Sequence, residues 1–310
     1  CINKALENIK LNTTSFWVSQ GNQLGDNEYV KIDGQVYNNR QCYLKALRLT
    51  NNHSVSWYKL GCTLIGTQDS VVVKGKKYSS TACFVKAVSL NRTWPSAWHQ
   101  LGFSLYATQQ KKTHVDGEAI SEKECYIKAL QFDYKRSTSW YSLGVALKRD
   151  EVAEISGKQY TSHKCFLEAV KLNNTDVESW SRVGKTLPKG ETHIVVDGER
   201  YNRLQCQLHA ISLDEKFALT WNNLGEILNN KDSIDVSGEI FTSRKCYIKA
   251  LEISVNFSEA WNNLGAILLP DEEVTVNDEI VTEQDCYSNA LYWNKNNFDA
   301  QNNAQFSWSI

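Results

Sequence analysis

The sequence lacks most of the features that mark common functional classes. It contains no methionine, only three prolines and six histidines, and its formal net charge is −1 over 310 residues. A chain this close to neutral, with scattered lysine and arginine, has no field that would attract nucleic acid or an anionic membrane. No run approaches the roughly 18 apolar residues of a membrane-spanning helix. We therefore expect neither a nucleic-acid partner nor a membrane span.

Signatures of catalysis and metal binding are also missing. The histidines occupy unrelated places, no glycine-rich phosphate loop occurs, and no cysteine pair has the Cys-x-x-Cys spacing. The acidic run Asp271, Glu272 and Glu273 is typical of a solvated loop. Without a nucleophile beside a base, or a cluster of metal ligands, we predict no enzyme, no metal and no other cofactor.

The feature that is present is a repeat with steps of 40 to 42 residues. A tryptophan usually follows the repeated cysteine by 15 residues, and a glycine follows the tryptophan by four. The cysteines are Cys1, Cys42, Cys83, Cys125, Cys165, Cys206, Cys246 and Cys286. The tryptophans are Trp17, Trp57, Trp98, Trp140, Trp180, Trp221 and Trp261. Seven whole periods are present, so the repeat sets the domain organisation.

Each period predicts two helices and a hairpin. Cys246, Ala250 and Ile253 have the spacing of an amphipathic helix, and a second helix is expected from near Ser258 to near Pro270. Between the helices, β-branched residues alternate around a two-residue pair that is typical of a type I′ turn. These pairs include Asp33-Gly34, Asp116-Gly117, Asp197-Gly198, Ser237-Gly238 and Asn277-Asp278. The residues predicted to cap the following helix include Ser121, Thr161 and Thr242.

These helical patterns resemble the tetratricopeptide repeat (TPR) family. Trp261, Leu264 and Gly265 match the family's helix A, and Tyr247 and Ala250 match its helix B. A family repeat has about 34 residues, and the roughly six additional residues form the hairpin. The resemblance implies an all-α repeat solenoid, a TPR-like superhelix, with a short β-hairpin in each repeat. It also implies partner peptides in a concave groove, with contacts from Asn222, Asn223, Asn262 and Asn263.

The hairpins have three explanations that the sequence leaves open. They could be longer turns between helices, they could pair with their neighbours in a continuous sheet, or their edges could dock another chain. An isolated hairpin is only marginally stable in water, so each is expected to pack on its own helices or on a neighbouring hairpin.

Five Asn-X-Ser/Thr sequons lie in the loops that join helix B of one repeat to helix A of the next. Their asparagines are Asn12, Asn52, Asn91, Asn173 and Asn256. Clustering in such a small part of the chain favours N-glycosylation along one ridge. The alternative is that Asn and Ser are common at helix ends, so that sequons arise there by composition.

The repeated cysteines are predicted to be buried apolar residues and not disulfides. They occupy equivalent places on successive B helices, and the intervening A helix separates them by more than a disulfide spans. They fit the apolar helix stripe as small hydrophobes. Cys62 alone breaks the register, and a bridge to Cys42 or Cys83 is left open.

The two ends of the chain are incomplete repeats. Within a single solenoid over 1–310, residues 1–10 correspond to a lone helix B and 292–310 to a half-repeat with an apolar tail. Each end lacks what the other has, so head-to-tail self-assembly into a filament is expected. The predicted assembly interface comprises Cys1, Ile2, Ala5, Leu6, Phe306, Trp308 and Ile310. The start within a repeat and the lack of methionine also predict that a leader or further chain has been removed or left out.

Two functional hypotheses follow from these patterns. In the first, the chain is a secreted, N-glycosylated structural protein whose partners are copies of itself and N-linked glycans. In the second, it is an intracellular adaptor that binds partner peptides in the groove. The sequons and half-repeats favour the first, whereas the usual role of the family and the free cysteines favour the second.

Overall fold

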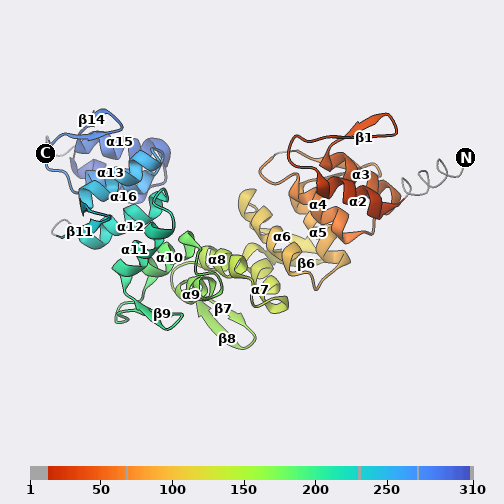
Figure 1. Ribbon diagram of the computed structural model, residues 1–310, viewed down its shortest axis with the longest axis horizontal. Helices are drawn as coiled ribbons and strands as arrows, with labels where there is room; N and C mark the ends of the chain where they lie inside the picture. The colour runs from red at the N-terminus through yellow and green to blue at the C-terminus, as the bar shows by residue number, and fades with distance from the viewer. Residues whose placement is uncertain (1–12, 68, 230–231, 271, 308–310) are drawn as a thin grey trace, which may run out of the picture. The chain divides into compact units, whose positions relative to one another are not determined.

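The computed structural model describes residues 13–67, 69–229, 232–270 and 272–307, with side chains described as far as residue 304. The chain divides into two compact units, Cys1–Ser162 and His163–Ile310, called unit 1 and unit 2 below. In each unit, pairs of successive helices alternate with small hairpins along the chain (Figure 1). The even-numbered helices occupy the helix A position and are called A helices, and the odd-numbered ones are B helices.

Unit 1 contains four A helices, three complete B helices and four hairpins among its described residues. Its A helices are α2 (Thr14–Gln23), α4 (Ser54–Cys62), α6 (Pro95–Ala107) and α8 (Ser137–Ala146). Its B helices are α3 (Asn39–Leu49), α5 (Ser80–Leu90) and α7 (Glu122–Phe132). Its hairpins pair β1 (Val30–Ile32) with β2 (Gln35–Tyr37), β3 (Val71–Val73) with β4 (Lys76–Tyr78), β5 (Lys112–Val115) with β6 (Glu118–Ser121), and β7 (Val152–Ile155) with β8 (Lys158–Thr161).

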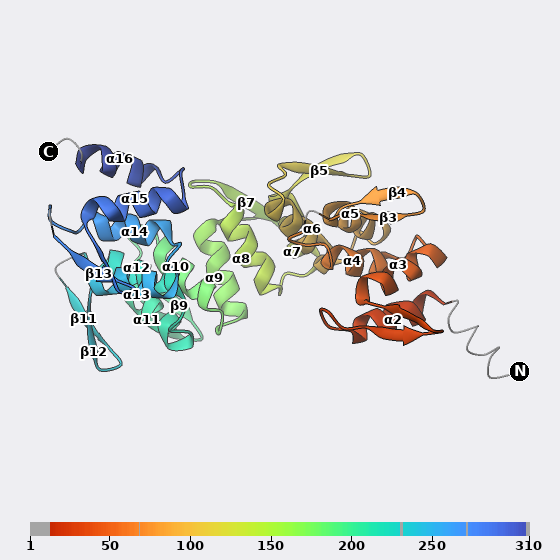
Figure 2. The same cartoon turned by 90° about the horizontal axis from the view of Figure 1, so that it is seen from above.

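Unit 2 continues the series from the B helix at its start. Its B helices are α9 (Ser162–Leu172), α11 (Arg203–Leu213), α13 (Ser243–Ile253) and α15 (Glu283–Trp293). Its A helices are α10 (Val177–Thr186), α12 (Ala218–Leu228), α14 (Ser258–Gly265) and α16 (Phe298–Ser307). Its hairpins pair β9 (Ile194–Val196) with β10 (Glu199–Tyr201), β11 (Ser233–Val236) with β12 (Glu239–Thr242), and β13 (Val274–Val276) with β14 (Glu279–Val281). Helices α12 to α16 lie as successive layers (Figure 2).

This arrangement confirms the predicted fold class, an all-α TPR-like repeat with a β-hairpin in each period. One boundary was wrong: α14 ends at Gly265 and not near Pro270. Past Gly265 the backbone bonds from Ile267 to Leu264 and from Leu268 to Gly265 close tighter three-residue turns, so the α-helix does not continue. The single solenoid over 1–310 stays a prediction, because it concerns the join between the units. The lone helix B predicted for 1–10 lies outside the described residues.

In five of the A helices, the repeated glycine is the point where an aromatic ring of a B helix contacts the backbone. A Cβ added to Gly102 would lie 2.7 Å from Cε1 of Tyr126, and one added to Gly225 would lie 2.6 Å from Cε1 of Tyr247. Real Cβ atoms do not approach a ring this closely, so only glycine admits the aromatic side chain there. The resulting close approach explains why the aromatic and glycine positions repeat together in the sequence.

The repeated tryptophan fastens both the preceding loop and the hairpin. Trp221 donates its indole N–H to the carbonyl of Glu215, six residues earlier, at 2.7 Å. The same bond recurs at Trp57, Trp98, Trp140, Trp180 and Trp261. In α16, Gln301 replaces the tryptophan and keeps the bond, donating to the Lys295 carbonyl at 2.6 Å. Each A helix is thus tied to the loop that enters it.

The hairpins are separate two-stranded sheets anchored on their own repeats. Both residues of each turn have positive φ, as in Asp116 at 50° and Gly117 at 89°, which confirms the predicted type I′ turns. In five of the seven described hairpins, an aromatic residue on the second strand packs against the repeat's tryptophan, as in Trp180 and Tyr201 with ring centroids 4.7 Å apart. No described strand of one hairpin pairs with another hairpin, so of the three explanations left open, the continuous sheet is excluded for the described strands.

The described cysteines are free, and the seven repeated ones among them are at most 1% exposed. This burial confirms the predicted apolar role. Burial also raises the pKa of the Cys83, Cys165 and Cys246 thiols to about 12, so they stay protonated and unreactive at neutral pH. Cys62 forms no disulfide with Cys42 or Cys83.

Hydrogen bonds at the helix starts agree with the sequence. Ser121 accepts from the backbone N–H of Glu124 and Thr242 from that of Lys245, which confirms these two predicted caps. None of the described helices has the length and hydrophobicity needed to cross a bilayer.

Candidate functional site on the A helices

The A helices present one face built from the two residues that follow each tryptophan, here called the +1 and +2 residues. In unit 2 the +2 side chain of one A helix donates to the +1 side chain of the preceding A helix. Asn223 donates to Ser181 Oγ at 2.9 Å, and Asn263 donates to Asn222 Oδ1 at 3.0 Å. These bonds form what we call the amide ladder.

The ladder extends to the last helix of the chain. Asn303 of α16 donates to Asn262 Oδ1 of α14 at 3.0 Å. Asparagine suits both positions because its side chain carries an acceptor for the following helix and a donor for the preceding one. The repeated Asn-Asn pairs therefore have a structural explanation, which is the joining of successive A helices.

The ladder uses all four of the asparagines that were predicted to bind peptide. Asn222 is 0% exposed, Asn223 is 1% exposed and Asn262 is 6% exposed, whereas Asn263 is only partly buried. Asn223 Oδ1 has no hydrogen-bond partner among the described atoms. Of the four predicted residues, Asn263 is thus the one whose side chain an incoming peptide could reach most directly.

A carboxylate lies at the centre of the ladder's solvent-facing side. Glu226 Oε1 accepts from Asn222 at 3.0 Å, from Asn263 at 3.3 Å and from Lys185 Nζ at 3.0 Å. These donors come from α10, α12 and α14. The side chains of Lys185 and Glu226 are 40% and 38% exposed. The second oxygen, Oε2, makes no hydrogen bond in the described part of the chain, so the cluster can accept a donor from outside.

A buried polar contact supports the ladder from the B helix below it. Gln207 of α11 stands where the other B helices carry tyrosine or phenylalanine, and it is 0% exposed. Its amide donates to the Ser181 carbonyl at 3.0 Å, and Ser181 Oγ donates to Gln207 Oε1 at 3.2 Å. Because Ser181 also receives the Asn223 bond, the contact fixes the start of the ladder.

The sequence prediction did not include Ser181, Lys185, Gln207 or Glu226. Only Gln207 carried a signal, because it breaks the aromatic position after the repeated cysteine. The others are ordinary surface residues in the sequence, and only the packing of successive A helices brings them together.

The same face in unit 1 has different chemistry. Its +1 residues include Tyr58 and His99, and the ring of Tyr58 lies 4.6 Å from that of Trp94. Phe103 on α6 is 38% exposed. His99 Nδ1 lies 3.0 Å from Ser139 Oγ, and burial together with the Arg136 charge lowers the pKa of His99 to about 4. Unit 1 thus offers rings and a neutral imidazole where unit 2 offers amides and a carboxylate.

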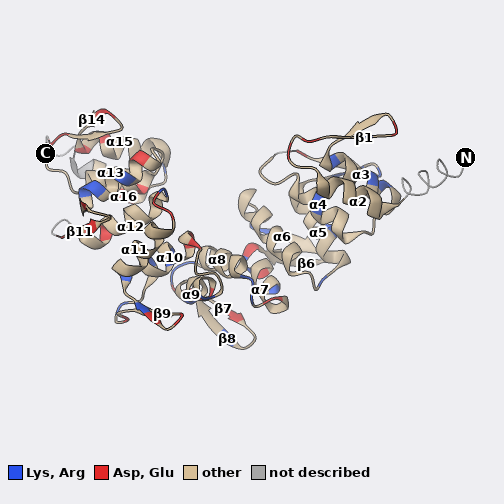
Figure 3. Ribbon diagram, in the orientation of Figure 1, with Lys and Arg blue, Asp and Glu red and all other residues tan. Residues whose placement is uncertain are grey.

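Charged residues do not single out another site. Lysine, arginine and acidic residues occur in both units without one sign dominating a helix face, and most of the ribbon carries neither (Figure 3). No group of three or more potential metal ligands occurs among the described residues. The described residues also contain no nucleophile placed beside a base and an orienting acid.

Two of the predicted glycosylation asparagines form a defined turn. Asn91 and Asn173 are exposed, and Asn173 Oδ1 accepts from the backbone N–H of Thr175 at 3.3 Å and from its hydroxyl at 2.9 Å. Asp133 and Asp214 make the same backbone contact in other repeats. The turn by itself therefore favours Asn or Asp at this position.

The other sequons differ in geometry. Asn52 and Asn256 are exposed, but the hydroxyl of Ser258 in the second sequon is buried and donates to the Ala290 carbonyl at 2.8 Å. Asn12 lies outside the described residues, as do Cys1, Ile2, Ala5, Leu6, Trp308 and Ile310 of the predicted assembly interface. Phe306 belongs to α16, but its side chain is not described.

No family model and no curated protein matches the sequence. Among solved structures, the chain is similar to YrrB, described as a TPR protein with an unusual peptide-binding site, with 17% identity and a TM-score of 0.44 over 71% of this chain and 96% of that one. It is also similar to a chain of the APC/C hetero-tetramer Cut9–Hcn1 (13% identity, TM-score 0.49, 86% of this chain, 44% of that one). A third is yeast Tom70 (15% identity, TM-score 0.42, 87% of this chain, 52% of that one). The chain thus spans about half of the last two.

Proposed function

We propose that the chain is a non-enzymatic protein-interaction repeat protein, and that the A-helix face of unit 2 binds an extended segment of a partner protein. The observation that carries this proposal is the Glu226 cluster. A half-exposed carboxylate is held by donors from three successive A helices, and one of its oxygens is open. A fixed acceptor of this kind is what a peptide N–H or a basic side chain needs.

The position of Asn263 adds a second contact for the same peptide. Its amide nitrogen already donates to Asn222 and Glu226, but its carbonyl oxygen accepts only a long 3.5 Å bond from Asn262, so it can accept from a peptide N–H beside the open oxygen of Glu226. Because both side chains are already held by the ladder, little side-chain entropy is lost on binding. This arrangement supports the adaptor hypothesis.

A peptide-display selection on the full chain tests the proposal. Selected peptides should lose at least about tenfold in affinity with Glu226→Gln and with Asn263→Ala, since each removes one fixed contact. Glu252→Gln, which alters an exposed acid on the B helix α13, is the matched control and should leave affinity unchanged. Selected peptides that bind all three variants like the parent chain would show that the face is not the binding site.

Glycosylation of a secreted form is a second proposal, favoured by the exposure of both Asn and Thr at 91–93 and 173–175. Intact mass of protein from its native source, before and after an enzyme that removes N-glycans, tests it. A bare polypeptide mass would exclude it.

The proposed filament depends on the predicted interface at the two ends of the chain. Deleting residues 299–310 should leave monomers in a light-scattering measurement, and unchanged assembly would refute this proposal.

A further inference from the structure

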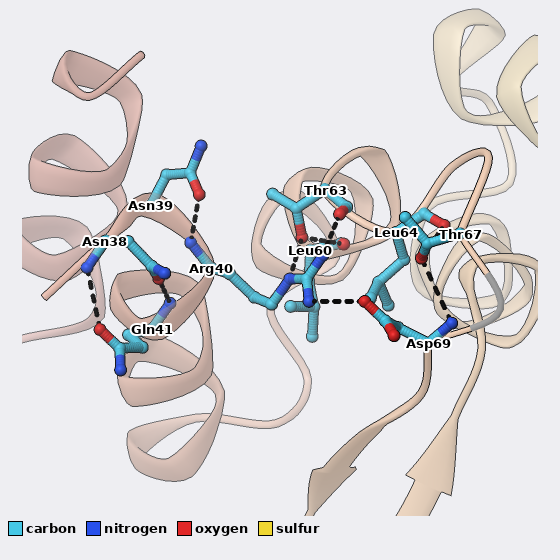
Figure 4. A network of polar contacts seen from close by, with 9 residues as sticks. All are labelled: Asn38, Asn39, Arg40, Gln41, Leu60, Thr63, Leu64, Thr67 and Asp69. Carbon is cyan, nitrogen blue, oxygen red and sulfur yellow. Dashed lines mark hydrogen bonds and ion pairs between the residues drawn. The ribbon is translucent and has the colours of Figure 1, made fainter. Parts of the chain in front are cut away.

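A basic side chain near the start of several B helices ties the helix to the end of the next A helix. Arg40 of α3 donates to the Thr63 carbonyl at 2.5 Å and to Thr63 Oγ1 at 3.4 Å, and pairs with Asp69 at 3.2 Å (Figure 4). Corresponding contacts join Lys123 of α7 to Glu151 in the loop after α8, and Arg244 of α13 to Glu272 in the loop after α14. The last carbonyls of an α-helix lack intrahelical partners, so a cation there is favourable.

The repeat that begins with α5 lacks this tie. Thr81 stands two residues before Cys83, where Arg40, Lys123 and Arg244 stand relative to their own cysteines. Thr81 is 4% exposed, and its hydroxyl has no hydrogen-bond partner among the described atoms. A threonine is too short to reach the following loop as the arginines do.

The acid of the pair is absent too. Gln109 stands eleven residues after its tryptophan, which is the position of Glu151 and Glu272 in their repeats. Both members of the ion pair are thus replaced by neutral residues in this one repeat of unit 1.

An open cavity of about 580 Å³ lies at this place. It is lined by Ser79 and Ser80 at the start of α5, by Ser104 and Thr108 near the end of α6, and by Asp69. Ser104 follows its tryptophan by six residues, as Thr63 does, so the cavity reaches the position where Arg40 binds one repeat earlier. Thr81 is the next residue after the two serines that line it.

We propose that this cavity binds an arginine or lysine side chain of a partner protein. The partner would supply from outside the basic group that α3, α7 and α13 supply from within the chain. The hydroxyl oxygens of Ser104 and Thr108 and the carboxylate of Asp69 are its acceptors, and the C-terminal end of α6 favours its positive charge. The site lies in unit 1 and is independent of the face proposed for unit 2.

Titration of the full chain with N-acetyl-arginine amide tests the proposal, followed by backbone amide NMR shifts. We expect saturable shifts at residues 79–81 and 104–109 in the millimolar range, which is reasonable for a single side chain. N-acetyl-citrulline amide has nearly the same shape without the charge and should bind at least about tenfold more weakly. No saturable binding of the arginine probe, or equal binding of both probes, would overturn the proposal.

Variants at Thr81 show whether binding occurs in this cavity. Thr81→Arg should abolish it by filling the site from within, whereas the isosteric control Thr81→Val should retain it. The double variant Thr81→Lys with Gln109→Glu rebuilds the Lys123–Glu151 pair, and should abolish binding while keeping at least the parent's urea midpoint. If this folded double variant binds the probe like the parent chain, the site is elsewhere. Asp69→Asn should weaken binding at least about threefold.

Discussion

At the +1 position of the A helices, unit 1 carries Tyr58 and His99, whereas unit 2 carries Ser181, Asn222 and Asn262. The tryptophan immediately before these residues, and the glycine four residues after it, are the same in both units. The indole bond to the preceding loop, the ring against the helix glycine and the type I′ turn also recur in both. The core therefore fixes the repeat, and the A-helix face is where one part of the chain differs from the other.

The difference shows what the repeat leaves free. A side chain at the glycine would clash with its neighbours, and a residue that replaces the tryptophan must still donate to the loop carbonyl, as Gln301 does, but a +1 residue need only suit its neighbour in the next repeat. Rings satisfy this in unit 1 and asparagines in unit 2. The two units consequently offer a partner different side chains on the A-helix face.

Removing a core ring should have the largest effect and should not distinguish the units. Tyr126→Ala in unit 1 and Tyr247→Ala in unit 2 each empty the space against a helix glycine, and should each cost about 3–5 kcal/mol of unfolding free energy. Urea unfolding followed by tryptophan fluorescence measures both. A cost in one unit several-fold above that in the other would contradict a common core.

Lowering the pH should destabilise unit 1 through the protonation of His99. Its folded pKa is lowered from 6.5 to about 4, so the unfolded chain binds the proton more tightly. The resulting stability is fully present above pH 6.5 and is lost as the pH falls towards 4, by an amount on the order of 3 kcal/mol. His99→Gln should flatten this part of the urea-midpoint profile. An unchanged slope between pH 6.5 and pH 4.5 would show that another group is responsible.

Breaking the ladder should cost more in unit 2 than the matching change in unit 1. Asn263→Ala leaves buried Asn222 without its donor from α14, and should cost about 1–3 kcal/mol. Gln100→Ala removes the corresponding bond to the Tyr58 phenol, whose ring stays packed on Trp94, and should cost about 1 kcal/mol. Equal urea midpoints for the two variants would remove the ladder as a distinguishing feature of unit 2.

The smallest effect is expected on the outer faces of the hairpins. Val72 and Val195 are 51% and 47% exposed, whereas the residues on either side of each in its strand are buried. Val72→Thr and Val195→Thr should each change stability by less than about 0.5 kcal/mol. A loss of unfolding free energy above about 1 kcal/mol in either variant, measured by urea unfolding, would mean that another part of the protein covers the outer face.

Much of the fold could be predicted because it repeats. The spacing of Cys246, Ala250 and Ile253, and pairs such as Asp116-Gly117, specify local structure through helix period and turn geometry, and seven copies make these patterns plain. The site was harder to predict. The adjacent pairs Asn222-Asn223 and Asn262-Asn263 stand out in the sequence but were assigned to peptide binding, because sequence spacing does not show that the +2 residue of one helix contacts the +1 residue of another.

The sequence by itself determined the helix pairs, the type I′ hairpins and the burial of the repeated cysteines, because each depends on residues near one another in the chain. Only the tertiary structure decided that the asparagines bond to one another, that Lys185 and Glu226 form an ion pair, and that a cavity lies between the start of α5 and the end of α6. These features join side chains from successive repeats about 40 residues apart. Their distances depend on how the helices pack, which no local pattern encodes.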